Sequence, residues 1–264
     1  MTIAFRITEV PSIDSTNAAL REEAAAGALE GLVLRADEQT SGRGRRGRGW
    51  DSPAGNLYVS LLLRPDCKPA EGATVGFVAA VALGRVLRDL TPADVLHKWP
   101  NDLLIDGRKM TGVLLEAGTK PDGRLDWLVL GMGVNIRSHP ETGLYPTTDL
   151  VASGGPSIAP QDLLKRFLAV FGPYYDAWAE GGFQAIRADW LAFAAGIGER
   201  VVARLEREEV TGSFADLDPD GALIMQLDSG QQRRIAAGDI FFPHLFPPPS
   251  AGEGRVGVPH NSSL

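Results

Sequence analysis

Residues Gly42 to Trp50 constrain the fold more than any other stretch of this chain, because their sequence is incompatible with a helix, a strand or a buried core. The run Gly-Arg-Gly-Arg-Arg-Gly-Arg-Gly-Trp alternates arginine with glycine and has no apolar face. Unpaired charge is costly to bury, and glycine disfavours both helix and strand. The run therefore predicts a mobile connection, called here the cationic loop. Guanidinium groups match phosphate or carboxylate, so we expect the loop to close on an anion; a solvated basic linker is the plainer alternative.

The composition limits the kind of partner. The chain has 264 residues, 44% hydrophobic and 22% charged, with a net charge of -7. A local basic loop on an acidic protein indicates a small anionic ligand and argues against a nucleic-acid partner. Cys67 is the only cysteine, which fits a reducing cytoplasm. The start carries no signal-peptide core and no apolar run reaches membrane-spanning length, so we expect a cytoplasmic protein without a membrane partner. Four histidines at scattered positions give no metal-ligand spacing, and we expect no prosthetic group.

The apolar periodicity and the turn residues predict an α+β chain. Helices are expected over residues 15–26, 71–90, 160–180 and 183–195, and strands over 31–37, 56–63, 95–98, 103–105, 109–116 and 125–136. Pro173 is expected to kink or break the third helix. The Asp106-Gly107 pair between two apolar runs predicts a hairpin.

The pattern changes near Gly198. From there to Phe242 the chain offers only short strands and turns, which predict a small β-barrel of SH3-like size. We therefore expect a large domain over residues 1–198 and a small one over 199–246. The remaining residues, 247–264, are rich in Pro, Gly and Ser and predict a disordered tail.

The cationic loop contains a formal dinucleotide fingerprint, Gly42-x-Gly44-x-x-Gly47. That motif must lead from a strand into a helix, whereas here Trp50 to Gly55 and then a strand follow. No Gly-Lys-Ser/Thr of a phosphate-binding loop occurs either. A bound nucleotide would therefore be held by arginine and lysine side chains.

A second motif is Lys98-Trp99-Pro100-Asn101-Asp102. Pro100 interrupts a strand, so the two polar side chains after it can face a cleft, although an ordinary Asn-Asp turn explains them equally well. The Asp106-Gly107 turn folds Lys109 back toward them. A lysine and a carboxylate flanking one pocket suit an ATP–Mg²⁺ site.

Two further segments have both a plain and a functional explanation. Gly131 and Gly133 in a strand indicate either a β-bulge or the close approach of a flat ligand such as a nucleotide base. The Ser15-Thr16-Asn17 segment is a helix N-cap, and its hydroxyl and amide groups could also meet a polar ligand. Gln39 could add another amide.

Together these motifs resemble those of the biotin protein ligase family, the biotin–[acetyl-CoA-carboxylase] ligases, over about residues 15–136. The matching motifs stand in the family's order: Ser15-Thr16-Asn17, Gln39, Gly42 to Trp50, Asn56-Leu57-Tyr58, Lys98-Trp99-Pro100-Asn101-Asp102, Arg108-Lys109-x-x-Gly112-x-Leu114-x-Glu116 and Gly131-x-Gly133-x-Asn135. The resemblance implies a mixed β-sheet backed by helices, related to the class II aminoacyl-tRNA synthetases, and a C-terminal SH3-like barrel. Some members carry an N-terminal DNA-binding domain, which we expect this chain to lack.

The resemblance also implies roles for single residues. The expected biotin-binding residues are Ser15, Thr16, Asn17, Gln39, Arg43, Gly44, Arg45 and Lys109. The expected ATP-binding residues are Arg45, Arg48, Trp50, Asn101, Asp102, Lys109 and Asn135. Lys109 and Arg45 are expected to be catalytic, and Asp102 is a candidate metal ligand.

The family's reaction joins biotin to a protein. ATP and biotin are expected as substrates, with Mg²⁺, giving biotinyl-5′-AMP and then a biotinylated lysine on a biotin carboxyl carrier domain. Whether the chain forms a homodimer is left open by the sequence. One alternative is a lipoate or octanoate ligase or transferase of the same fold; the transferases need a nucleophilic cysteine, and Cys67 lies at a strand end. The alternative of another class is an RNA-binding module that uses the cationic loop.

Overall fold

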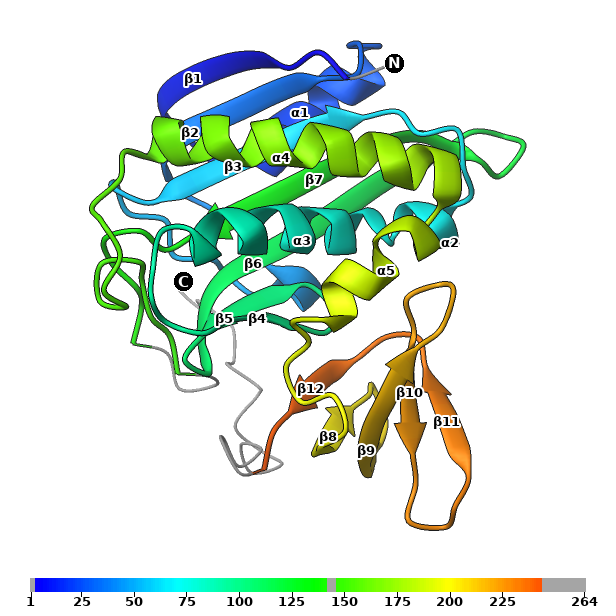
Figure 1. The fold of residues 1–264 in the computed structure, drawn as a ribbon. Helices are drawn as coiled ribbons and strands as arrows, with labels where there is room; N and C mark the ends of the chain where they lie inside the picture. The colour runs from blue at the N-terminus through cyan, green and yellow to red at the C-terminus, as the bar shows by residue number, and fades with distance from the viewer. Residues whose placement is uncertain (1–2, 142–145, 244–264) are drawn as a thin grey trace, which may run out of the picture.

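Two β-sheets and a layer of helices make up the computed structural model, which describes residues 3–141 and 146–243 (Figure 1). The predicted tail, 247–264, and the last residues of the predicted small domain lie outside the described residues. The large sheet is mixed: β1 runs parallel to β2, and every other neighbouring pair is antiparallel. In spatial order its strands are β1 (Arg6–Ile13), β2 (Leu32–Gln39), β3 (Leu57–Leu63), β7 (Leu125–Val134), β6 (Arg108–Thr119), β5 (Asp102–Ile105) and β4 (Val95–Lys98).

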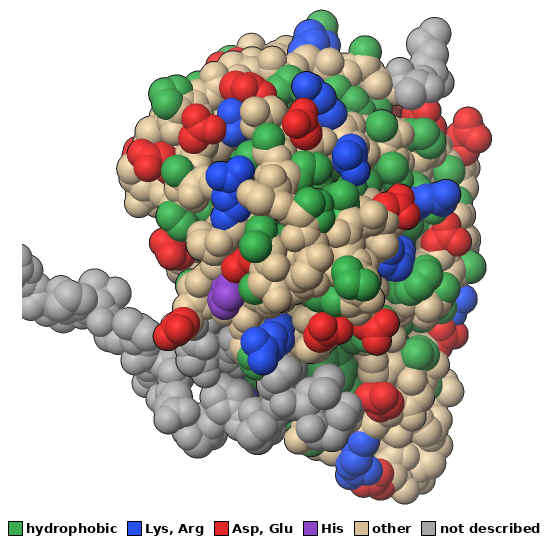
Figure 2. Space-filling view, turned by 60° about the vertical axis from the view of Figure 1, so that its left-hand side comes forward, with side chains coloured by type: hydrophobic (Ala, Val, Ile, Leu, Met, Phe, Trp, Pro, Cys, Tyr) green, Lys and Arg blue, Asp and Glu red, His purple; other side chains and the backbone are tan. Residues whose placement is uncertain are grey.

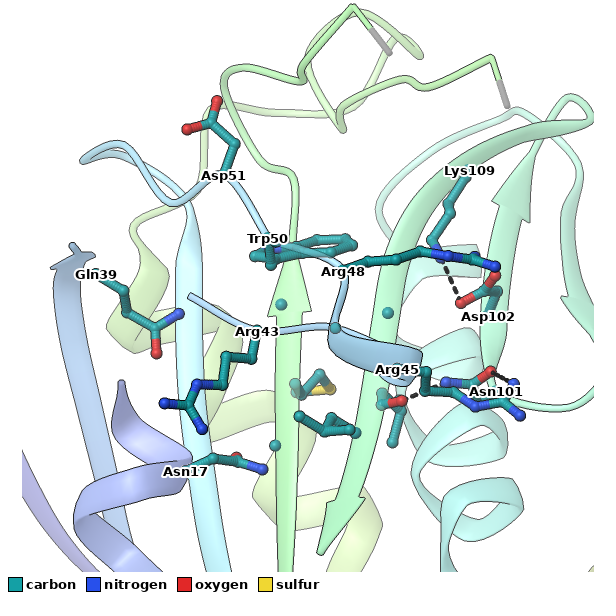
Figure 3. A pocket seen from close by; sticks show the side chains of 18 of the residues that line it. Asn17, Gln39, Arg43, Arg45, Arg48, Trp50, Asp51, Asn101, Asp102 and Lys109 are labelled. Atoms are coloured by element: carbon teal, nitrogen blue, oxygen red, sulfur yellow. Dashed lines mark hydrogen bonds and ion pairs between the residues drawn. The ribbon is translucent and has the colours of Figure 1, made fainter. Parts of the chain in front are cut away.

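The two faces of this sheet are covered unequally. Helices α3 (Val75–Arg88), α4 (Pro160–Gly181) and α5 (Gln184–Leu191) pack on one face with the short α2 (Pro69–Gly72) (Figure 1). Among the described residues, the one helix on the opposite face is α1 (Thr16–Ala25), which buries Leu20 and Ala24 against Leu62 and Val129. Part of this second face therefore stays open, and the cationic loop lies over the open part (Figure 3).

Local chemistry explains where these elements begin and turn. The Ser15 hydroxyl accepts the backbone N–H of Ala18 and so begins α1, and Gly27 follows its end with φ +88°. Asp106 and Gly107 both have positive φ and join β5 to β6, which confirms the predicted hairpin. The helix expected over 71–90 forms as α2 and α3.

Two features differ from the sequence prediction. Strand β1 was not expected, because its side chains are mostly exposed and Pro11 interrupts its polar sequence. Of the two effects predicted for Pro173, the break is wrong, since α4 continues through that residue, and the kink stays a prediction. A proline inside a helix costs about 3 kcal/mol, but Phe171, Tyr175 and Trp178 on either side of it are buried in one stack of rings.

The C-terminal part forms a five-stranded antiparallel sheet, as the change of pattern near Gly198 predicted. Its strands, in spatial order, are β11 (Gln232–Ile235), β10 (Leu223–Gln226), β9 (Glu209–Leu217), β8 (Arg200–Arg204) and β12 (Asp239–Phe241). The buried Trp99 side chain donates to the Gly221 carbonyl at 2.9 Å, and the apolar residues of both parts form one core. The boundary between residues 198 and 199 stays a prediction.

One helical stretch among the described residues, Pro69–Arg88, has the length and apolarity of a membrane span. Most of it is buried inside the protein, where α3 packs against α4 and the sheet. It is the central core helix of this fold.

Candidate active site

A cavity of about 770 Å³ lies between the cationic loop and the open half of the large sheet. Every residue that the sequence predicted for the site lines it, from four separate regions of the chain (Figure 3). These residues are Ser15, Thr16, Asn17, Gln39, Arg43, Gly44, Arg45, Arg48, Trp50, Asn101, Asp102, Lys109 and Asn135.

One wall of the cavity is polar but uncharged. Gln39 Oε1 accepts from the Thr16 backbone N–H at 2.9 Å and from its hydroxyl at 3.1 Å, while Gln39 Nε2 donates to Ser52 Oγ at 3.1 Å. The Ser60 hydroxyl donates to Asn17 Oδ1 at 2.6 Å. These dipoles are buried or half-buried and are held by protein hydrogen bonds before any ligand arrives. They therefore suit a polar, neutral head group and discriminate against one that lacks matching atoms.

The strand glycines allow side chains to lie directly on the sheet. A Cβ at Gly131 would lie 2.0 Å from Asn17 Oδ1. A Cβ at Gly133 would lie 2.4 Å from Trp50 Nε1, and one at Gly112, its partner across β6 and β7, 3.0 Å from the same ring. The register of β7 runs without a bulge through these positions, so the bulge explanation is wrong. The glycine pair makes a flat platform, which the Trp50 indole covers.

A cation and a carboxylate meet at the other end of the cavity. Lys109 Nζ lies 2.8 Å from Asp102 Oδ1 and 5.7 Å from the centre of the Trp50 ring (Figure 3). Arg45 Nη1 donates to Asn101 Oδ1 at 2.9 Å, and burial lowers the pKa of Arg45 despite the nearby Asp239 and Asp102. The predicted approach of Lys109 to the Asn101-Asp102 segment is therefore present. Positive charge in a partly buried cavity attracts anionic ligands strongly.

Asn135 presents an unused acceptor. Its Nδ2 donates to the Thr148 carbonyl at 3.1 Å, while Oδ1 is buried without a hydrogen-bond partner. Trp50 Nε1 is also buried without one. Orphaned buried polar atoms are rare in native proteins, so both atoms suit contacts with a bound molecule.

Asp239 is a charged site residue that the sequence did not reveal. It lies on β12 of the small sheet, and its carboxylate is 2.6 Å from Arg48, 3.7 Å from Arg46 and 3.9 Å from Arg45. Burial opposes its ionisation, yet the Arg48 hydrogen bond and the three arginine charges together keep the pKa of Asp239 below its ordinary value. No local motif marks it, since only the packing of the small sheet brings it to the cationic loop.

The cationic loop also carries its own backbone bonds. Gly44 N donates to the Arg48 carbonyl at 2.8 Å, and Trp50 N donates to the Gly42 carbonyl at 2.9 Å. A single 3-10 turn, Arg45–Gly47, contains Arg46 in the left-handed region at φ 57°. The loop thus has a defined shape that points its arginines into the cavity and toward β12.

The predicted metal ligand, Asp102, lines the cavity. In the described ranges 3–141 and 146–243, no three His, Cys, Asp or Glu side chains cluster as metal ligands. The Asp102 carboxylate faces Lys109. The metal role of Asp102 stays a prediction, and no reaction step is assigned to a metal held by the protein.

Sequence comparisons identify relatives of both parts of the chain. Residues 9–135 match the model of the biotin/lipoate A/B protein ligase family, and residues 196–242 match the biotin protein ligase C terminal domain. The chain is 38% identical to a biotin–[acetyl-CoA-carboxylase] ligase of Paracoccus denitrificans, over 87% of this chain and 97% of that protein. It is 32% identical to the bifunctional ligase/repressor BirA of Bacillus subtilis, over 86% of this chain and 71% of that protein.

The fold has relatives among solved structures as well. A biotin protein ligase from Aquifex aeolicus, solved in complex with biotin and ATP, superposes with a TM-score of 0.75 at 26% identity. The match covers 89% of this chain and 97% of the Aquifex chain, so it includes both sheets.

Proposed function

This chain belongs to the biotin protein ligase family, and we propose that it activates biotin with ATP and transfers it to a lysine of a biotin carboxyl carrier domain. The observation that carries the proposal is that one cavity has a neutral polar end and a positively charged end. Fixed neutral dipoles at Thr16, Asn17 and Gln39 form one end, and the cations Lys109 and Arg45 form the other. Biotin has a neutral ureido head and an anionic tail, which these two ends match.

In the first step an oxygen of the biotin carboxylate attacks the α-phosphorus of ATP, which enters as its Mg²⁺ complex. The bond from Pα to the bridging oxygen breaks, pyrophosphate leaves with the electron pair, and biotinyl-5′-AMP remains. Two anions must approach each other for this reaction. A unit charge pair at ~4 Å is worth roughly 4 kcal/mol at an effective dielectric of 20. Lys109 and Arg45, at the charged end of the cavity, are the groups we assign to stabilise that approach.

The adenine is assigned to the Trp50 side of the cavity. The indole covers the Gly112–Gly133 platform, and Asn135 Oδ1 lies buried nearby without a partner. An aromatic face and one spare acceptor suit a purine with an exocyclic amine. The phosphates and ribose of ATP are assigned to the charged end of the cavity, where Asn101, Asp102 and Arg48 lie.

In the second step the amine of the acceptor lysine attacks the acyl carbon of biotinyl-5′-AMP. An amide bond forms, AMP leaves, and the amine loses a proton to solvent. Water would compete for the same carbon, so a closed cationic loop protects the intermediate until the acceptor arrives. The anchoring of the loop through Arg48 and Asp239 supports this assignment.

The finer features of the fold are proposed on the same basis. We assign residues 1–198 to the catalytic domain, with a sheet related to the class II aminoacyl-tRNA synthetases, and residues 199–246 to an SH3-like barrel. A cytoplasmic location is proposed from the single cysteine, which fits a reducing compartment.

The rival functions have less support. Cys67 is buried, does not line the cavity, and burial raises the pKa of its thiol to about 11, which disfavours nucleophilic attack. An RNA-binding surface is disfavoured because three loop arginines face Asp239. On the face seen in Figure 2, basic and acidic side chains are interspersed rather than gathered into a basic patch.

Label transfer tests the proposal directly. The purified chain is incubated with ATP, labelled biotin and a biotin carboxyl carrier domain, and label on the acceptor lysine is counted. We expect label that depends on ATP and on that lysine. Parallel reactions with lipoate and octanoate test the alternative substrates. Transfer of either in place of biotin would reject the proposal.

A further inference from the structure

The Asn17 amide is held by hydrogen bonds on both sides. Ser60 Oγ donates to Asn17 Oδ1 at 2.6 Å, and Asn17 Nδ2 donates to Glu116 Oε2 at 2.9 Å. Gly131 lies directly beneath the amide, where any Cβ would collide with Oδ1. The position of the side chain is therefore fixed. The remaining freedom is a flip of the amide by about 180°, which would exchange Oδ1 and Nδ2.

Only one of the two partners can decide that direction. The Ser60 hydroxyl, which also lies 2.8 Å from Thr16 Oγ1, can donate or accept, so it would satisfy either end of the amide. An ionised carboxylate only accepts, so Glu116 tolerates Nδ2 and repels Oδ1. Glu116 thereby excludes the flipped amide.

Glu116 acts from outside the cavity. Asn17 lines the cavity and is 5% exposed, whereas Glu116 is not among the lining residues. It stands on the same face of β6 as Leu114 and Gly112, two and four residues earlier, which do line the cavity. Arg21 Nη1, on α1, holds the other carboxylate oxygen at 2.8 Å. Glu116 therefore reaches a ligand only through Asn17.

We propose that Glu116 is a positioning residue for ligand specificity: it fixes the direction of the Asn17 amide, and so decides that the cavity offers the ligand the remaining N–H of Nδ2. This inference rests on the proposed function, in which the ligand is the ureido group of biotin. The ureido oxygen is the acceptor that such an N–H would bind. The Arg21 pair steadies Glu116 but, being partly exposed, contributes less than the carboxylate itself.

The test compares two ligands in biotin-dependent exchange of pyrophosphate into ATP. The ligands are biotin and 2-thiobiotin, in which a weakly accepting sulfur replaces the ureido oxygen. Glu116→Gln keeps the shape and an acceptor but removes the preference for one amide direction. We expect it to raise the KM for biotin about 10-fold, with the KM for ATP within about 2-fold of wild type. The preference for biotin over 2-thiobiotin should narrow by a similar factor.

Three further variants separate a positioning role of Glu116 from a general structural one. Arg21→Ala leaves the Glu116–Asn17 contact and should change the KM for biotin by no more than about 3-fold. Glu208→Gln removes a glutamate that pairs with Arg233 in the small sheet and does not line the cavity, so it should change neither KM. Glu116→Ala should behave like Glu116→Gln with a larger effect, and if it does not fold, Glu116→Gln still decides.

Two outcomes would overturn the inference. One is a Glu116→Gln enzyme with the wild-type KM for biotin. The other is an equal rise in KM for biotin and 2-thiobiotin, because a merely structural role would weaken both ligands alike. A wild-type enzyme without biotin-dependent exchange would instead reject the proposed function, so the two failures are distinguishable.

Discussion

At the scale of single residues, Lys109 is the cation that we assign to stabilise the approach of biotin carboxylate and ATP. Its ammonium group lies between the Asp102 carboxylate and the face of Trp50, at the charged end of the cavity. We expect Lys109→Gln to reduce adenylate formation about 10²-fold or more, as for loss of one preorganised charge stabiliser. Biotin-dependent pyrophosphate exchange measures it. Lys165→Gln, at an exposed lysine on α4, is the control, and exchange by Lys109→Gln at the control's rate would remove Lys109 from the mechanism.

The two glycines of β7, Gly131 and Gly133, are assigned to different ligands, Gly131 to biotin and Gly133 to ATP. Gly133→Ala places a methyl group 2.4 Å from Trp50 Nε1, so we expect a higher KM for ATP, by about 10-fold, with biotin less affected. Gly131→Ala displaces Asn17, so we expect it to raise the KM for biotin and to affect the KM for ATP less. Gly76→Ala, whose methyl would meet Leu115 at an ordinary 3.5 Å, is the control. Equal effects of both strand variants on both ligands would contradict this division of the cavity.

How well the site could be predicted also differs from residue to residue. The lysine and the polar residues at 15–17 and 101–102 belong to contiguous motifs, and the Asp106-Gly107 turn fixes where Lys109 must lie. Asp239 has no motif, because it becomes a site residue only through the packing of a distant strand. The function of Glu116 as a partner of Asn17 also depends on the register of β6 against β7, which the sequence does not specify.

At the scale of elements, the cationic loop and β12 act together. Asp239→Asn removes the carboxylate that Arg48, Arg46 and Arg45 share. A hydrogen bond to a charged group is worth about 1.5–3 kcal/mol, so we expect the loop to open more often and to release biotinyl-AMP about tenfold faster. Arg45→Ala should also leak, since it loses the bond to Asn101 as well.

Chromatography of reactions without an acceptor counts the released adenylate. Asp228→Asn is the matched control, because it breaks an exposed pair with Arg200 in the same small sheet. Leakage from Asp239→Asn no faster than from this control would show that the small sheet does not hold the loop closed.

The elements themselves were predictable where their own residues dictate them. Helix α1 has its Ser15 cap, α3 its apolar periodicity and the β5–β6 hairpin its turn. Strand β1 was missed because it gains its place from pairing with β2 and not from an apolar face. The break at Pro173 was wrongly expected because aromatic packing on both sides outweighs the local cost.

At the scale of the whole molecule, the large and small sheets share a continuous interface. The His97 backbone N–H donates to the Phe193 carbonyl at 2.7 Å, and its carbonyl accepts from Ala195 at 2.8 Å, just before the small sheet begins. The buried His97 ring bonds through Nδ1 to the Trp190 carbonyl at 2.9 Å, which requires the proton on Nδ1. Burial lowers the pKa of His97 to about 4.

This interface predicts acid sensitivity of the entire fold. The pKa of His97 is depressed from an ordinary value near 6.5, so the unfolded chain binds more protons between the two values. Stability is therefore complete above about pH 6.5 and falls as the pH drops toward 4, by about 2 kcal/mol between pH 7 and pH 5. Urea unfolding of wild type and of His97→Gln measures it, and the variant should depend less on pH over that range. The same change of unfolding free energy with pH in wild type and His97→Gln would contradict the prediction.

The single core shared by the two sheets, with Trp99 bonded to Gly221 across it, has a consequence for how reactants enter and leave. Strand β12 cannot swing away without exposing buried aromatic side chains, so the small sheet is a fixed wall. Passage of the carrier protein's lysine is then assigned to bending of the chain between Gly42 and Trp50, which lies over the cavity. Small-angle scattering should accordingly give the same radius of gyration for the free enzyme and for the enzyme saturated with biotin and ATP.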